Sequence, residues 1–241
     1  MKVDPDYEVA PAQGAMTLVE HLTELRQRLI WSIGGVATAT VVSYFVIDQI
    51  MACLVAPAGK LYYLSPAEAF FAQCKVAFVC GLLIGLPLLC YHIWAFFAPA
   101  LTHRERSIGL VLVPGAAALF YLGTAFAYHF ALPAAIRFFL GFATDSLTPM
   151  LSLGEYIAFV LSFCLPFGFV FQLPIVMLVL ALSGIVVPSF FAGKRKYVVV
   201  LSFVAGAIIS PTPDIIGQTM LALPIIVLFE VSLVLTRLFV R

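Results

Sequence analysis

Residues 156–193 read YIAFVLSFCLPFGFVFQLPIVMLVLALSGIVVPSFFAG, and none of these 38 residues is charged. One helix of this length would measure about 57 Å at 1.5 Å per residue, far more than the ~30 Å hydrocarbon core of a bilayer. Two spans would leave no residues for a turn between them. We therefore expect one membrane-spanning helix over about 155–182, followed by a return along the surface in which Gly184 and Pro188 break the helix.

The composition of the whole chain agrees with a membrane environment. Of its 241 residues 63% are hydrophobic and only 10% are charged, whereas a soluble domain carries about 25% charged residues. The formal net charge of +1 lacks the large positive excess that is typical of nucleic-acid-binding proteins. These values predict an all-α integral membrane protein with a single polytopic domain over residues 1–241.

Uncharged runs elsewhere predict six transmembrane helices in total. After a cytoplasmic N-terminal segment at 1–28, the spans are expected at about 29–48, 68–98, 107–132, 155–182, 197–211 and 217–236. The last two are short, so the bilayer must thin around them. Prolines at positions 87, 114, 166, 174 and 224 lie inside these spans and tend to bend them. Bent helices of unequal length predict a concave wall rather than a tight cylinder.

The distribution of lysine and arginine predicts the orientation, because cytoplasmic loops carry an excess of both. With both termini inside, ten of the thirteen basic residues are cytoplasmic, namely Lys2, Arg26, Arg28, Arg104, Arg106, Lys194, Arg195, Lys196, Arg237 and Arg241. A seven-span arrangement would put Lys194–Lys196 outside. The acidic residues near the N-terminus do not fit a secretory signal, so we expect a retained first span in a multi-pass protein of the cytoplasmic (inner) membrane.

The chain lacks the common motifs of catalysis. There is no Walker A sequence, no His-Glu-x-x-His, no Gly-x-Ser-x-Gly and no His/Cys cluster with metal-ligand spacing. The five cysteines contain no Cys-x-x-Cys pair and are expected to be small packing residues. We therefore expect no enzyme activity, no cofactor and no metal.

Two polar residues lie at unusual depth. Gln172 is near the middle of the fourth predicted span, and Glu230 lies within the sixth. An ionisable group in a span is costly in lipid and suggests a function, whereas an interhelical hydrogen bond or proximity to the cytoplasmic interface would be a structural explanation. Together with Lys75 they could form a midplane site in a secondary transporter for a small solute. The lack of an internal repeat disfavours this alternative.

Acidic residues also stand on the predicted cytoplasmic face, which is otherwise basic. In EHLTELRQRL, residues 20–29, Glu20, Glu24 and Arg28 recur every fourth position on one helical stripe. A Glu24–Arg28 ion pair on a surface helix is the simplest interpretation. In the loop FFAPALTHRER, residues 96–106, Glu105 stands between two arginines. Two isolated carboxylates on such a face are what a cationic ligand would need.

Four stretches, in order, resemble the TatC subunit family of twin-arginine protein translocases. They are EHLTELRQRL (20–29), LPLLCYHIWAFFAPALTHRER (86–106), FGFVFQLPIV (167–176) and SPTPDIIGQTMLALPIIVLFE (210–230). The resemblance extends over roughly residues 17–236. It implies a receptor that binds twin-arginine signal peptides of folded precursor proteins. It further implies partners of the TatA/TatB type, which span the membrane once, and transport driven by the proton motive force; self-association stays open.

The resemblance also implies roles for particular residues. Glu24 and Glu105 match the acids that form the family's patch for the arginine pair. A guanidinium group can bond a carboxylate through two parallel N–H donors, which lysine cannot copy. Arg26 and Arg28 are expected to orient these acids and to repel nonspecific cations. Phe96 and Leu101 match positions beside the patch, where they either meet the apolar part of the signal or simply pack the loop.

Further expectations concern the outer side and the interior of the membrane. Pro57 matches a position in the first outer loop and is expected to shape an outer cap, while Asp214 and Gln218 begin the sixth span at the outer surface. The short last spans are the expected docking side for partner helices. Many family members have glutamate where this chain has Gln172. If the family's function at that site requires a negative charge, this protein must work without it.

Overall fold

Two of the long helices begin at recognisable serine caps. Ser65 precedes Pro66 and accepts a hydrogen bond from the N–H of Glu68 at 3.3 Å, and Ser152 does the same for Glu155 at 3.5 Å. Both sequences follow the Ser-x-x-Glu pattern of a helix N-terminus.

The computed structural model describes residues 18–98, 103–144, 149–182, 184, 186–209 and 215–239. Over this part of the chain the architecture is all-helical. The elements are α1 (Leu18–Phe45), α2 (Ile47–Val55), α3 (Pro66–Phe97), α4 (His103–Phe126), the π-helix η2 (Ala127–Ala131), α5 (Leu132–Leu140), α6 (Leu153–Val170), α7 (Leu173–Leu182), α8 (Pro188–Gly193), α9 (Arg195–Ile209) and α10 (Ile215–Phe239).

Four helical stretches are long and apolar enough to cross a membrane, over Pro66–Phe96, Leu112–Leu140, Leu153–Leu182 and Ile215–Leu238. A fifth span results if α1 and α2, bent by 77°, are taken as one. The expected fifth span of the sequence corresponds to α9, which has only 15 residues. By contrast α10 has 25 residues and is longer than expected. The full count of six therefore stays a prediction that depends on α9.

The long uncharged run forms two collinear pieces and a return. A break at Phe171 and Gln172 separates α6 from α7, and Gly184 then adopts a φ of +69°. Only glycine enters that backbone region at little cost, so the chain can reverse there before α8 begins at Pro188.

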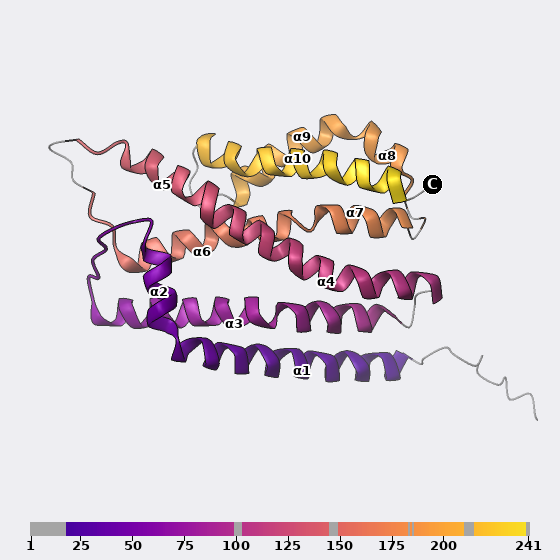
Figure 1. The fold of residues 1–241 in the computed structure, drawn as a ribbon, viewed down its shortest axis with the longest axis horizontal. Coiled ribbons are helices and arrows are strands. Elements are labelled where there is room, and N and C mark those ends of the chain that lie inside the picture. The colour runs from indigo at the N-terminus through magenta and orange to yellow at the C-terminus, as the bar shows by residue number, and fades with distance from the viewer. Residues whose placement is uncertain are drawn as a thin grey trace, which may run out of the picture.

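Most helices run along the long axis and place both described chain ends at the same end of the molecule, on its opposite edges (Figure 1). The beginning of α1, the end of α3 and the beginning of α4 lie at one end of the molecule, and the end of α10 lies there too. The bent α2 and the beginning of α6 lie at the other end. The charged residues of these helix ends therefore lie at the same end of the molecule.

Close contact between α1 and α3 depends on small residues. Gly81 and Gly85 of α3 form a Gly-x-x-x-Gly pair, and a Cβ at Gly81 would overlap the backbone of Thr40 on α1. A Cβ at Gly85 would lie 3.0 Å from a methyl group of Val36. Such small residues let two helices approach in a membrane. The aromatic core lies elsewhere, around Phe163 and Phe167 of α6, which are 1% and 0% exposed.

The beginnings of α3 and α6 are joined by polar contacts. Glu68 accepts hydrogen bonds from the N–H groups of Leu64 at 2.8 Å and Gly154 at 2.7 Å, and from the hydroxyl of Ser152. Beside it, Tyr62 pairs with the backbone of Leu151 and Leu153. These bonds hold the segment between α2 and α3 against the beginning of α6.

Candidate functional site

Glu24 lies in the second turn of α1 and is held by Arg28 one turn later. Oε1 of Glu24 accepts from Nε of Arg28 at 2.9 Å and also from Nη2. The two side chains are 21% and 25% exposed respectively. The expected ion pair is therefore present, and Arg28 fixes the orientation of the carboxylate from within the same helix.

The second oxygen of this carboxylate has a different environment. Oε2 of Glu24 is buried and has no hydrogen-bond partner among the described residues. A buried acceptor without a partner costs about 1–3 kcal/mol, and such atoms are uncommon in native proteins. The arrangement leaves one acceptor for a donor from outside the chain.

Two more buried polar atoms without described partners lie on the last turns of α3, namely Nδ1 of His92 and Nε1 of Trp94. His21 of α1 stacks on Phe96 of α3, with ring centroids 4.2 Å apart. Glu24, one turn after His21, is therefore level with the end of α3. All three orphaned atoms belong to the same end of the α1–α3 pair.

The beginning of α4 completes this end of the molecule. Glu105 is the third residue of α4, and this helix starts beside the end of α3, which packs against α1 (Figure 1). A Cβ at Gly109, one turn further, would overlap the indole of Trp94, so α4 approaches α3 closely. Leu101 lies outside the described residues.

Arg26, the other arginine near the beginning of α1, does not contact the carboxylate of Glu24 through an ion pair in the described structure. Arg26 is exposed and takes part in none of the ion pairs of the described residues, which join Glu24 to Arg28 and Glu230 to Arg195. The positioning role expected for Arg26 stays a prediction.

Gln172 lies at the break between α6 and α7. Its Nε2 donates to the carbonyl oxygen of Ala116 on α4 at 3.0 Å and, more weakly, to that of Gly168 at 3.4 Å. The amide nitrogen therefore makes an interhelical hydrogen bond, as the structural explanation expects. Its side-chain oxygen makes none of the hydrogen bonds recorded for the described chain, so it remains able to accept.

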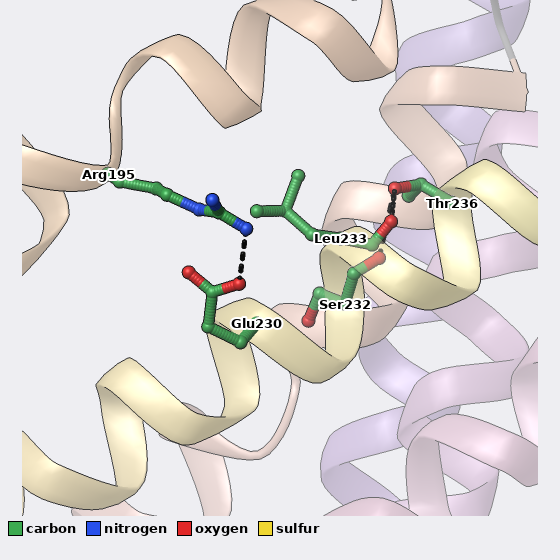
Figure 2. A network of polar contacts seen from close by, with 5 residues as sticks. All are labelled: Arg195, Glu230, Ser232, Leu233 and Thr236. Carbon is green, nitrogen blue, oxygen red and sulfur yellow. Dashed lines mark hydrogen bonds and ion pairs between the residues drawn. The ribbon is translucent and has the colours of Figure 1, made fainter.

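Glu230 is paired with a basic residue of the neighbouring helix α9. Figure 2 shows the guanidinium of Arg195, at the start of α9, reaching the carboxylate of Glu230 on α10; the Nη2–Oε2 distance is 2.7 Å. The two side chains are 53% and 44% exposed. Nearby, Ser232 and Thr236 are fully buried, and their hydroxyls bond to carbonyls of α10 itself.

The expected outer-side residues are spread over several elements. Pro57 is half-buried in the turn after α2. Gln218 joins the last two helices, because its Nε2 donates to the carbonyl oxygen of Phe203 on α9 at 2.7 Å. Asp214 lies outside the described residues.

Sequence reasoning missed His92, Trp94 and Gly109. A tryptophan and a histidine near a helix end are ordinary at a membrane interface, and only their burial without partners marks them. Among the described residues no group of three His, Cys, Asp or Glu side chains is placed to hold a metal ion.

The fold is that of a multi-pass helical membrane protein, and the α1–α3 end of its described part holds a carboxylate with one buried, unpartnered oxygen. The family model described as "Sec-independent protein translocase protein (TatC)" matches residues 20–224. The chain belongs to this family, which is one of protein translocase subunits rather than of enzymes.

Relatives and a solved structure agree with this assignment. The TatC protein of Carboxydothermus hydrogenoformans is 35% identical over 226 residues, covering 92% of this chain and 93% of its own. That of Aquifex aeolicus is 38% identical over 234 residues, covering 94% and 97%. A crystal structure titled twin arginine translocase receptor TatC matches with a TM-score of 0.79 at 38% identity, covering 92% of this chain and 100% of the other. The transporter alternative finds no support.

Proposed function

We propose that this chain is the receptor subunit of a twin-arginine translocase and that the α1–α3–α4 end binds the arginine pair of a signal peptide. The solved relative is described as a twin arginine translocase receptor, which supports a twin-arginine peptide as the ligand. In this proposal Glu24 binds one guanidinium and Glu105 the other. The end that carries them faces the cytoplasm, where the basic residues gather.

The buried, unpartnered Oε2 of Glu24 is the observation that carries this proposal. A guanidinium supplies donors in a planar fork that suits a carboxylate. Arg28 already occupies Oε1, so an incoming arginine would complete the coordination of a carboxylate that is held in place. Preorganisation of this kind lowers the cost of binding.

The aromatic groups beside Glu24 support a second part of the proposal. The imidazole Nδ1 of His92 is a buried polar atom without a described partner that a peptide backbone could satisfy, whereas the indole Nε1 of Trp94 faces Gly109 of α4. Phe96 stacks against His21 and supports a role in contacting the apolar part of the signal. Single-span partners of the TatA/TatB type would then complete the translocase, and transport would use the proton motive force.

The test is site-specific crosslinking of the full-length protein in membranes to a twin-arginine signal peptide. We expect Glu24→Gln or Glu105→Gln to weaken signal binding about tenfold, since a hydrogen bond to a charged group contributes roughly 1.5–3 kcal/mol. The matched control is Glu155→Gln, which changes an exposed glutamate in the first turn of α6 at the opposite end. A Lys-Lys signal should bind weakly to every variant. Unchanged binding by the double variant would refute the proposal.

A further inference from the structure

A large hollow lies on the face formed by α6, α7, α9 and α10. It has a volume of about 1060 Å³ and is lined along α6 and α7 from Ala158 to Leu180. Leu201 of α9 and Phe229 of α10 form the facing side, and Lys75 of α3 lies at the margin. The hollow follows about 33 Å of helix, at 1.5 Å per residue, which is comparable with the thickness of the hydrocarbon core.

The lining is apolar apart from three residues, Lys75, Ser162 and Ser202. Both serine hydroxyls are satisfied within their own helices, where they donate to the carbonyl oxygens of Ala158 at 2.6 Å and Val198 at 2.7 Å. Lys75 is exposed and makes none of the hydrogen bonds or ion pairs found among the described residues. Its ammonium group is the one unsatisfied charge beside an otherwise apolar groove.

The position of Lys75 along α3 determines how deep in the membrane its ammonium group lies. Lys75 is the tenth residue of a 32-residue helix, about 13 Å from the beginning at 1.5 Å per residue. Side chains of a helix lean toward its N-terminus, and lysine near a membrane boundary extends its ammonium to the interface. The beginning of α3 is the outer end in the expected orientation. In that orientation an extended Lys75 side chain would carry its ammonium toward the outer headgroups, at the margin of the groove.

One helix of this face, α9, is too short to cross the hydrocarbon core unless the bilayer thins beside it. With 15 residues, α9 is about 22 Å long, which is shorter than the ~30 Å hydrocarbon core. Lipid next to a short span must thin or rearrange at some cost. A hollow beside such a helix, with a cation at its outer margin, suits a molecule that has an anionic head and long apolar chains.

We propose that this groove binds one phospholipid of the outer leaflet, with its phosphate at Nζ of Lys75 and its acyl chains along α6, α7 and α9. The attraction between the phosphate and the ammonium group of Lys75 positions the lipid headgroup at the margin of the groove. The apolar side chains that line the groove pack against the acyl chains. This site lies at the end opposite to Glu24 and does not depend on the proposed receptor function. A single-span partner helix in the groove is the competing occupant.

The test uses the full-length protein purified in mild detergent, stripped of lipid and titrated with dioleoylphosphatidylglycerol, with bound lipid measured by native mass spectrometry. We expect Lys75→Gln to weaken binding about tenfold and Lys75→Arg to retain it. The matched control is Lys60→Gln, an exposed lysine of the loop before α3 that should leave binding unchanged. Dioleoylglycerol, which lacks the phosphate, should bind equally to wild type and Lys75→Gln.

Equal phosphatidylglycerol affinity of wild type and Lys75→Gln would overturn the proposal, as would an equal loss in Lys60→Gln. A second measurement identifies the occupant in membranes. A photoreactive residue at Ala158 should form adducts with phospholipid. Adducts solely with a single-span protein would also overturn the proposal.

Discussion

At the scale of single residues, the chain satisfies its polar groups locally except where a ligand is proposed to bind. Glu230 has Arg195, Gln218 has a carbonyl of α9, and Gln172 has a carbonyl of α4. The buried exceptions in the described chain are on Glu24, His92 and Trp94. Because unpaired buried polar atoms are costly, their concentration at one end is the best evidence for a site.

The hydrogen bond of Gln172 leads to a prediction about stability. Gln172→Leu removes the donor to Ala116, and we expect it to lower the free energy of unfolding by about 1 kcal/mol, in the range measured for interhelical bonds in membranes. Thermal unfolding in detergent would measure this change. If Gln172 also bonds a partner helix or signal peptide through its oxygen, Gln172→Leu will translocate precursor less well. Translocation equal to wild type would refute that role.

Gln172→Glu is the informative companion variant. A carboxylate cannot donate to the carbonyl of Ala116, so the ionised variant must give up this bond. We expect it to be less stable than wild type at neutral pH and to recover as the pH falls, because the protonated acid can donate again. Thermal unfolding from pH 4 to pH 8 would show this. A stability difference independent of pH would contradict the interpretation.

At the scale of helices, the contact between α1 and α3 depends on glycine. Gly81→Ala places a methyl group against the backbone of Thr40, and we expect a loss of about 1–3 kcal/mol, as is typical for overpacking. The matched control is Gly34→Ala, where an added Cβ meets no atom within 4 Å. Thermal unfolding of both variants would test this prediction. Equal stability of the two would show that the α1–α3 contact tolerates separation.

The short helix α2 is held to the bundle by two tyrosines. The hydroxyl of Tyr128 donates to the carbonyl oxygen of Cys53 at 2.5 Å, and that of Tyr156 donates to Leu54 at 3.0 Å. Carbonyls in the last turn of a helix lack partners within it, so these bonds satisfy groups that would otherwise be orphaned. They also position the turn that contains Pro57.

Tyr156→Phe should therefore loosen the outer segment without disturbing the helix core. We expect about 1 kcal/mol of lost stability and faster protease cleavage between α2 and α3. The control is Tyr44→Phe, which changes an exposed tyrosine of α1. Cleavage at wild-type rate in Tyr156→Phe would mean that Tyr128 and the Tyr62 backbone pairing suffice.

At the scale of the whole molecule, several helices with basic residues near their beginnings start at the same end. The basic residues near the beginnings of α1, α4 and α9 lie at one end with the end of α10 (Figure 1), so we expect both termini in the cytoplasm. In a Cys53→Ser background, Lys60→Cys should react with an impermeant maleimide in intact cells, whereas Lys196→Cys should react only after permeabilisation. The reverse pattern would contradict the expected orientation.

The sequence alone determined the membrane class, the helical architecture, the family and the pairing of Glu24 with Arg28. These properties follow from composition, from the length of uncharged runs and from spacing within one helix, all of which are local along the chain. The tertiary structure alone decided that Glu230 meets Arg195, that Gln172 bonds α4, and that three orphaned atoms share one end with Glu105's helix. It also revealed the groove beside Lys75. Contacts between residues far apart in the sequence depend on how bent helices pack, and no local pattern encodes that packing.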